Sequence, residues 1–248
     1  MNSPVFDRAA PVFLERSVDS TNSYLRRMAD TAADGAAVIA VSQSAGRGRS
    51  GRGFLSPEGG LYLSVLRRPP VEGERLATLT PAVAVAVCRA ADAFCGVRCG
   101  IKWPNDVLLG GRKICGILVE SVLGGASACV IVGVGINVNT ASFPEELREI
   151  AGSIAGATGR EYDLTALSRV LLGELDACYD AWLADARFAL EEYRARCLSC
   201  GREVLAGGRP GFARAVGDDY SLIVRRGDGT EEALRFGEVS VRGLYGYV

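Results

Sequence analysis

The chain has 248 residues, of which 48% are apolar and 23% are charged, and its formal net charge is −1. This composition is typical of a globular protein with one large domain or one large and one small domain, and the near-neutral charge argues against a dedicated nucleic-acid binder, which is usually basic. No N-terminal stretch is typical of a signal peptide, and the apolar run at 83–91 is too short to cross a bilayer, so we expect a cytoplasmic protein with no membrane partner.

Strands are predicted where short apolar runs lie between turn residues, and helices where apolar residues recur every three or four positions. Along the first 200 residues the predicted strands are 11–16, 37–41, 61–66, 98–102, 107–109, 113–121 and 128–137. The predicted helices are 21–31, 75–94, one or two short ones within 143–157, then 164–184 and 188–197. Pro81 is an anomaly in the second helix, because proline begins or kinks a helix.

The pattern changes after Gly201. Short strand candidates separated by glycine and aspartate turns follow at 203–205, 212–216, 221–226, 233–236 and 239–242. Such a pattern is typical of a small β-barrel. We therefore predict a domain boundary near Cys200, with domains at 1–199 and 200–248.

A loop rich in arginine and glycine joins two predicted core strands. Residues 42–54 read SQSAGRGRSGRGF and contain Arg47, Arg49 and Arg52 together with four glycines. Glycines give such a loop freedom to approach a ligand, and arginines bind anions such as phosphate. The chain has no histidine, so any chemistry must use lysine, arginine, carboxylates or backbone amides.

Two further segments combine glycine with polar residues. One runs from Lys102 to Asp106 and continues through Lys113, and the other is Gly133-Val134-Gly135-Ile136-Asn137. Each is a weak signal alone: the lysines could be exposed strand charges, and strand glycines often mark only bulges. The glycine pattern is neither a dinucleotide-binding fingerprint nor a P-loop.

Eight cysteines are present, most of them in apolar surroundings that predict buried thiols. Cys197 and Cys200 form a lone Cys-x-x-Cys pair. A zinc site would need two more ligands, so we expect these two to be incidental thiols near the domain boundary.

Taken together and in this order, the motifs resemble those of the biotin–protein ligases (biotin–[acetyl-CoA-carboxylase] ligases). The matching stretches cover almost the whole chain: Asp19 to Asn22, Gln43, Ala45 to Arg49, Gly51-Arg52, Lys102 to Asp106, Arg112-Lys113, Gly116 to Leu118, Glu120, Gly133 to Asn137 and Gly237 to Arg242. The resemblance implies an α+β fold: a mixed-sheet catalytic domain related to class II aminoacyl-tRNA synthetases, followed by a small SH3-like β-barrel.

This sequence departs from the family pattern at two loop positions. Ser50 stands where the family often has another arginine, and Phe54 stands where it usually has tryptophan. We expect these changes to affect retention of the adenylate or stacking on it. No helix-turn-helix segment precedes the first predicted strand, so we expect the DNA-binding arm of some members, and a DNA partner, to be absent.

The family reaction that the resemblance implies has two steps. The biotin carboxylate attacks the α-phosphate of ATP to give biotinyl-5′-AMP and pyrophosphate, and a lysine of a biotin carboxyl carrier domain then attacks the adenylate and releases AMP. The expected catalytic residues are Lys113, Arg47 and Arg49, with Lys113 between the biotin carboxylate and the α-phosphate. The expected ATP and adenylate ligands are Arg49, Arg52, Phe54, Lys102, Asn105, Asp106 and Asn137. Asp106 is also expected to hold Mg²⁺, which prefers oxygen ligands.

The resemblance also implies a biotin site. Its expected members are Ser20, Thr21, Gln43, Gly46, Arg47, Lys113, Gly116, Leu118, Gly133 and Gly135. We expect residues 46–54 to be mobile without ligand and ordered with it, because a closed loop protects a reactive adenylate from water. A homodimer through sheet edges of the catalytic domain is compatible with the resemblance, which leaves the oligomeric state open.

Two other functions compete with this interpretation. A lipoate–protein ligase or lipoyl/octanoyl transferase shares the catalytic fold, although the arginine-rich loop and the segment from Lys102 to Asp106 disfavour it. A non-enzymatic RNA-binding protein with an Arg-Gly loop is the alternative from another class. The acidic overall charge and the lack of interleaved aromatic residues argue against it.

Overall fold

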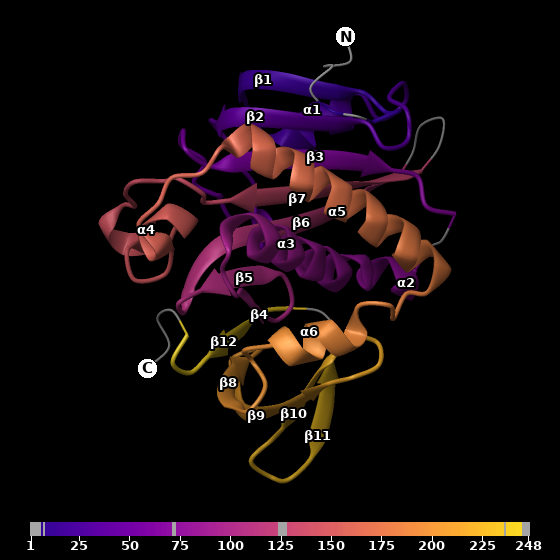
Figure 1. Cartoon of the computed structure of the whole chain (residues 1–248). Coiled ribbons are helices and arrows are strands. Elements are labelled where there is room, and N and C mark those ends of the chain that lie inside the picture. The colour runs from indigo at the N-terminus through magenta and orange to yellow at the C-terminus, as the bar shows by residue number, and fades with distance from the viewer. Residues whose placement is uncertain (1–5, 7, 71–72, 124–127, 236, 245–248) are drawn as a thin grey trace.

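The computed structural model describes residues 6, 8–70, 73–123, 128–235 and 237–244. The first sheet has seven strands. Figure 1 shows helices on both of its faces and a second sheet formed by the C-terminal residues. The expected α+β class with a mixed sheet is therefore confirmed.

The first sheet is mixed because one of its strand pairs is parallel. Its strands lie in the order β1-β2-β3-β7-β6-β5-β4, and β1 pairs with β2 in parallel while the other described neighbours are antiparallel. The bounds are β1 (Val12–Val18), β2 (Ala37–Gln43), β3 (Leu61–Arg67), β4 (Gly100–Lys102), β5 (Asp106–Leu109), β6 (Arg112–Val122) and β7 (Cys129–Ile136).

The two faces of this sheet carry different helices (Figure 1). The long helices α3 and α5 pack together on one face, and α1 contacts β2, β3 and β7 on the other. The helices are α1 (Thr21–Arg27), α2 (Glu74–Ala77), α3 (Leu79–Cys95), α4 (Ile154–Thr158), α5 (Leu164–Ala184) and α6 (Leu190–Arg196), with 3₁₀ turns at Arg49–Gly51 and Glu145–Leu147.

Helix α5 has the predicted bounds, whereas α1 ends earlier than predicted. The carbonyls of Ala29 and Ala32 accept hydrogen bonds from the Arg68 guanidinium, so the residues after Arg27 form turns instead of a further helical turn. The second predicted helix is divided at Thr78 into α2 and α3. Pro81 then lies in the first turn of α3, where the missing N–H costs no helical hydrogen bond.

Residues Glu74–Cys95 form the one described helical segment that is long and apolar enough to cross a membrane. Most of α3 is buried, and its apolar residues belong to the main hydrophobic core with the sheet and α5. This is the position of a core helix in a folded domain.

Residue alternation in β7 assigns its side chains to opposite faces. Val130, Val132 and Val134 belong to the core under α3 and α5, whereas Ile131 packs beneath α1. Further along the α1 face the large residues give way to small ones, and alternation places Gly133 and Gly135 there. The sheet is therefore closely packed on one face and open beyond the end of α1 on the other.

The C-terminal sheet is antiparallel, with strand order β11-β10-β9-β8-β12. Its strands are β8 (Arg202–Ala206), β9 (Arg209–Val216), β10 (Leu222–Arg225), β11 (Glu231–Leu234) and β12 (Val239–Val241). These lie within two to three residues of the predicted strands, apart from Phe236, which is outside the described residues.

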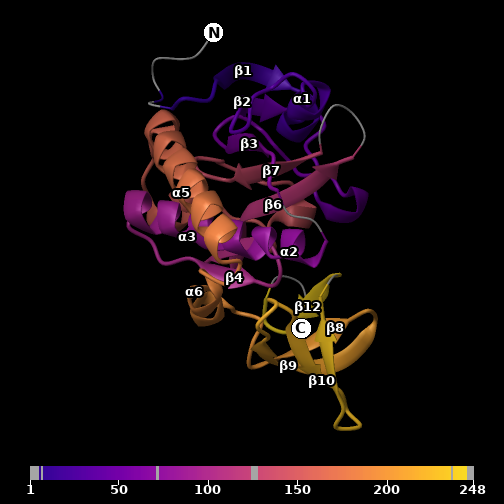
Figure 2. The same cartoon turned by 90° about the vertical axis from the view of Figure 1, so that its right-hand side faces the viewer.

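Both views place the second sheet below the first sheet and next to α6 (Figure 2). The Trp103 indole donates to the Tyr220 carbonyl, at 2.8 Å, and the Tyr193 hydroxyl donates to the Pro104 carbonyl, at 3.1 Å. Because Trp103 and Tyr193 are almost fully buried, these hydrogen bonds fix the turn after β4 against α6 and against the connection between β9 and β10 of the C-terminal sheet.

Candidate active site

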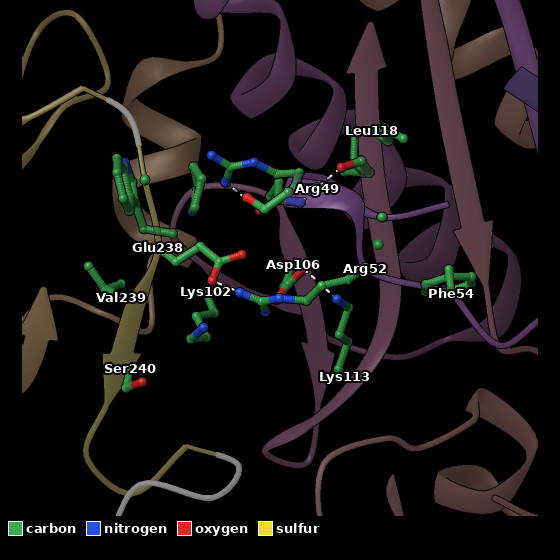
Figure 3. A pocket seen from close by; sticks show the side chains of 18 of the residues that line it. Arg49, Arg52, Phe54, Lys102, Asp106, Lys113, Leu118, Glu238, Val239 and Ser240 are labelled. Carbon is green, nitrogen blue, oxygen red and sulfur yellow. Dashed lines mark hydrogen bonds and ion pairs between the residues drawn. The ribbon is translucent and has the colours of Figure 1, made fainter. Parts of the chain in front are cut away.

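A cavity of about 910 Å³ lies between the open face of the first sheet and the C-terminal sheet. Its wall combines the Arg-Gly loop, the turn after β4, strands β6 and β7, and residues around β8 and β12. Figure 3 shows charged side chains from these separate elements pointing toward one another. The volume is in the range of small-molecule binding sites.

Glycines open a slot at one end of the cavity. A Cβ atom on Gly135 would lie 2.6 Å from the ring of Phe54, and one on Gly116 would lie 3.0 Å from it. The glycines thus let the Phe54 ring lie directly on the backbone of β6 and β7. Leu118 supplies an apolar side chain to the lining. The Phe54 ring thus occupies the space above these glycines, and a flat, largely apolar group can take its place when the ring moves aside.

A network of polar side chains borders the slot. The Gln43 Oε1 accepts hydrogen bonds from the Thr21 backbone N–H, at 2.8 Å, and from the Thr21 hydroxyl, at 3.1 Å. The Gln43 Nε2 donates to the Ser56 hydroxyl, at 2.7 Å. Ser20 and Thr21 are buried at the start of α1 and line the cavity. These groups present fixed donors and acceptors to a polar head group.

Asn22 completes this network and was not among the predicted site residues. Its amide nitrogen donates to Glu120, at 2.8 Å, and its amide oxygen lies 2.6 Å from the Ser64 hydroxyl. A Cβ on Gly133 would lie 2.1 Å from that oxygen, so Gly133 accommodates the Asn22 amide. Asn22 lies in the stretch from Asp19 to Asn22 that resembles the family, and this resemblance was the signal that could have found it.

The Arg-Gly loop folds as a small hairpin over the cavity. Gly46 and Phe54 are joined by a backbone hydrogen bond of 2.8 Å, as are Gly48 and Arg52. At its tip Ser50 has φ 55°, in the left-handed region, which costs a residue with a Cβ roughly 1 kcal/mol. Arg47 lies 3.4 Å from the Glu120 carboxylate at the edge of the loop.

Four cations gather around Asp106 at the other end of the cavity. The Lys113 ammonium lies 2.7 Å from the Asp106 carboxylate. Burial lowers the pKa of Lys102, and the nearby Lys113, Arg52 and Arg49 charges lower it further, against Asp106, which raises it. Burial likewise lowers the pKa of Arg49. Positive charge that is packed this closely and partly buried favours an anionic ligand.

Hydrogen bonds from side chains and backbone hold Arg49 and Lys113 of this cluster in place. The Arg49 guanidinium donates to the Asn105 amide oxygen, at 3.1 Å, and the Asn105 amide nitrogen donates to the Ile117 carbonyl, at 2.8 Å. The Lys113 backbone exchanges two hydrogen bonds with the segment 150–152. The cations therefore lie on anchored elements.

Two predicted site residues do not line the cavity. Asn137 is buried, and its amide nitrogen donates to the Gly152 carbonyl, at 3.1 Å. Gly46 lies at the base of the hairpin in the Arg-Gly loop, opposite Phe54, and a Cβ there would approach the Phe54 carbonyl to 2.3 Å. The structure thus places both as supports of the wall. It brings together in the cavity lining Ser20, Thr21, Gln43, Arg47, Arg49, Arg52, Phe54, Lys102, Asn105, Asp106, Lys113, Gly116, Leu118, Gly133 and Gly135.

The C-terminal sheet contributes residues that sequence reasoning did not assign to the site. Glu238 precedes β12 and forms an ion pair with Arg52 across the cavity (Figure 3). Val239 and Ser240 line the same side. The resembling stretch from Gly237 to Arg242 was the available signal, but nothing in the sequence indicated that it reaches the loop.

A magnesium site in the protein alone would need several oxygen ligands. No group of three or more histidine, cysteine, aspartate or glutamate side chains suitable for a metal occurs in the part of the chain that the structure describes. Asp106 is paired with Lys113. It can offer one carboxylate to a cation that brings its own phosphate ligands, which is how magnesium usually binds with nucleotides.

Comparisons with known proteins agree on one family. The biotin/lipoate A/B protein ligase family matches residues 14–137. The biotin–[acetyl-CoA-carboxylase] ligase of Paracoccus denitrificans is 34% identical over 239 residues, which cover 91% of this chain and 98% of that protein. The bifunctional ligase/repressor BirA of Bacillus spizizenii is 39% identical over 160 residues, which cover 62% of this chain. The match spans about half of that relative's length (49%).

A solved structure agrees as well. The biotin protein ligase from Aquifex aeolicus in complex with biotin and ATP superposes with a TM-score of 0.83 at 29% identity, covering 93% of this chain and 98% of that one. The similarity therefore extends over both sheets.

Proposed function

The chain belongs to the biotin/lipoate A/B protein ligase family, and we propose that it attaches biotin to a specific lysine of a biotin carboxyl carrier domain, with ATP as the second substrate and biotinyl-5′-AMP as the intermediate. Relatives named biotin–[acetyl-CoA-carboxylase] ligase and a ligase structure with biotin and ATP support this activity. The enzyme is an AMP-forming ligase.

One observation carries the proposal: a slot with a glycine floor opens directly onto a cluster of four cations in a single cavity. Biotin has an apolar body, a polar ureido head and a carboxylate. The slot suits the body, the network of Thr21 and Gln43 suits the head, and the cations suit the carboxylate and the phosphates. Neutralising the charge that develops in phosphoryl and acyl transfer is the main catalytic requirement.

Lys113 is the residue that we assign to the reacting groups. Its ammonium lies 6.0 Å from the centre of the Phe54 ring, at the junction between slot and cluster. From there it can contact the biotin carboxylate and the α-phosphate together. The ion pair with Asp106 orients the Lys113 ammonium before substrates arrive.

The remaining cations would bind the nucleotide. Arg49, Arg52 and Lys102 face the cavity, Asn105 orients Arg49, and Phe54 offers its ring to the adenylate. Arg47 at the loop edge would contact the reacting carboxylate. A magnesium ion bound to the nucleotide phosphates would withdraw charge from the leaving pyrophosphate, and Asp106 is the residue that would hold it.

We extend the proposal to the whole chain. Residues 1–199 form the catalytic domain, and residues 200–248 form an SH3-like domain that closes the cavity through Glu238. The partner is the carrier domain of a biotin-dependent carboxylase. A cytoplasmic location, the absence of DNA and membrane partners, and pairing of two copies through sheet edges stay expectations.

Pyrophosphate release tests the reaction. The purified chain is incubated with ATP and magnesium and with either biotin or lipoate, and a carrier domain is then added. We expect pyrophosphate release when biotin is present and not when lipoate replaces it. Addition of the carrier domain should then release AMP and give a biotinylated lysine. Pyrophosphate release that depends on lipoate would instead establish a lipoate–protein ligase. No pyrophosphate release with biotin or with lipoate would refute both ligase activities.

Lys113→Ala tests the assignment of the catalytic residue. We expect adenylate formation to be abolished while biotin still binds, because the slot is unchanged. Arg112→Ala is the matched control, since Arg112 is a neighbouring cation on the same strand and is not part of the cavity lining. Pyrophosphate release from the Lys113 variant at the wild-type rate would refute the assignment of Lys113 as the catalytic residue.

A further inference from the structure

Two thiols outside the cavity lie close together at the end of α6. The Sγ atoms of Cys197 and Cys200 are 3.7 Å apart, with the Cys200 thiol donating to Cys197. A disulfide has an S–S bond of about 2.05 Å. A movement of roughly 1.7 Å would therefore join the two sulfurs.

The segment between these cysteines is anchored at both of its residues. The Leu198 backbone N–H donates to the Ile101 carbonyl, at 2.8 Å. The Ser199 hydroxyl, fully buried, accepts a hydrogen bond from the Trp103 backbone N–H, at 3.0 Å. Because the intervening backbone is held against β4 and the turn after it, the thiols face each other in a fixed arrangement.

These two cysteines differ from the other six. Cys197 and Cys200 are half-buried, whereas Cys88, Cys95, Cys99, Cys115, Cys129 and Cys178 are all buried. Burial raises the pKa of the Cys178 and Cys88 thiols to about 12, which leaves almost no thiolate at neutral pH. Reactivity in a thiol requires both access and thiolate character.

The environment of Cys197 supplies the thiolate character. The hydrogen bond from Cys200, with help from the Ser199 and Cys200 backbone, lowers the pKa of Cys197 below that of an ordinary thiol, against the opposing effect of burial. The same hydrogen bond and burial raise the pKa of Cys200. Cys197 is thus the attacking sulfur, and Cys200 is the thiol that resolves a mixed disulfide.

Metal binding does not account for the pair. A structural zinc ion takes four nitrogen or sulfur ligands, the sequence has no histidine, and the described residues offer no third cysteine or carboxylate in a cluster with these two. The remaining chemistry of two adjacent thiols is oxidation to a disulfide.

We propose that Cys197 and Cys200 form a thiol–disulfide exchange site whose substrate is a low-molecular-weight organic disulfide, such as oxidised glutathione. The Cys197 thiolate attacks one sulfur of the substrate, breaks its S–S bond and releases one thiolate. Cys200 then loses its proton to water and attacks the Cys197 sulfur, which forms the intrachain disulfide and releases the second thiolate. The protein dithiol is oxidised by two electrons, and the organic disulfide is reduced to two thiols. This inference is independent of the proposed ligase activity.

Thiol counting on the folded, full-length chain tests the proposal. The protein is incubated with oxidised glutathione, the free thiols are alkylated, and intact and peptide masses are measured. We expect the wild type to lose two of its eight free thiols, both at Cys197 and Cys200, with no glutathione retained. The rate should rise with pH around a midpoint below that of an ordinary thiol, whose pKa is about 8.5, because the pKa of Cys197 is lowered.

Single substitutions separate the two roles. Cys200→Ser should accumulate glutathione on Cys197, because the resolving thiol is missing, and Cys197→Ser should react at least tenfold more slowly than the wild type. Cys129→Ser removes a buried thiol from β7 and should react as the wild type does. Retention of all eight thiols by the wild type, loss at other cysteines, or an undiminished rate in Cys197→Ser would each overturn the proposal.

Discussion

The contact between Gly133 and Asn22 gives the sharpest test of how the slot is built. In Gly133→Ala the new methyl group would lie 2.1 Å from the Asn22 amide oxygen and 2.9 Å from its carbon. These distances are far below van der Waals contact. Gly133 is in the middle of β7, paired with Ser64 and Leu118 on both sides, so the strand cannot retreat and the Asn22 side chain must leave.

The cost follows from the hydrogen bonds that Asn22 would lose. Its contact with Ser64 is a neutral bond, worth about 0.5–1.5 kcal/mol, and its contact with the Glu120 carboxylate is worth about 1.5–3 kcal/mol. The exchange of glycine for alanine in a strand returns roughly 0.5–1 kcal/mol. We therefore expect Gly133→Ala to lower the free energy of unfolding by about 1–4 kcal/mol.

A double-mutant cycle isolates this contact. In an Asn22→Ala background the amide is gone, so Gly133→Ala should be neutral or slightly stabilising in urea-induced unfolding. Gly173→Ala is the control, because Gly173 is exposed in the middle of α5 with open space around it; it should stabilise by roughly 0.5–1 kcal/mol. The same loss from Gly133→Ala in both backgrounds would refute the reasoning.

Three further predictions concern the cavity wall. Glu238→Gln removes the ion pair with Arg52; since exposed pairs contribute roughly 0.2–1 kcal/mol, we expect KM for ATP to rise by up to about fivefold, and an unchanged KM would show that the pair does not order the loop. Phe54→Ala removes the ring that covers Gly135, and we expect bound biotinyl-AMP to be released about tenfold faster. The reason is that full burial of a phenylalanine side chain contributes roughly 1.5–3 kcal/mol, and this side chain is half-buried. Release of biotinyl-AMP at the wild-type rate would contradict a covering role for the ring. Burial lowers the pKa of Lys102 below 10.5 in the folded chain, so the unfolded chain binds more protons between the folded and unfolded pKa values, and the stability of the wild type rises with pH across that window. Lys102→Met should therefore be more stable than the wild type near neutral pH, by a margin that shrinks as the pH approaches 10.5, while adenylation is lost. A stability margin that does not change with pH would argue against a buried charge at this position.

Periodic patterns within single elements were sufficient to predict most of the elements. Helix α5 has the predicted bounds because its apolar residues recur at helical spacing along its whole length. Strands β2 and β3 are apolar runs between turns, so the Arg-Gly loop between them was recognisable as a connection. The end of α1 could not be predicted, since it depends on Arg68, some 40 residues later in the chain.

The contents of the site were predicted better than their arrangement. Gly116, Gly133 and Gly135 were expected as slot residues, and they do line the cavity. Asn137 was expected at the phosphates but is buried behind the wall, because the chain turns after β7 and its amide bonds Gly152. Which face a residue occupies at the end of a strand depends on the turn that follows, and local sequence determines this poorly.

The sequence by itself determined the two-sheet organisation, the glycine and arginine content of the loop, and the resemblance to one family, because these are properties of single segments. Only the tertiary structure decided which segments meet. Asn22 reaches Gly133, Arg52 reaches Glu238, and the thiols of Cys197 and Cys200 face each other. The first two contacts depend on the order of strands in the sheet and on how the second sheet docks, and both result from packing summed over the whole chain.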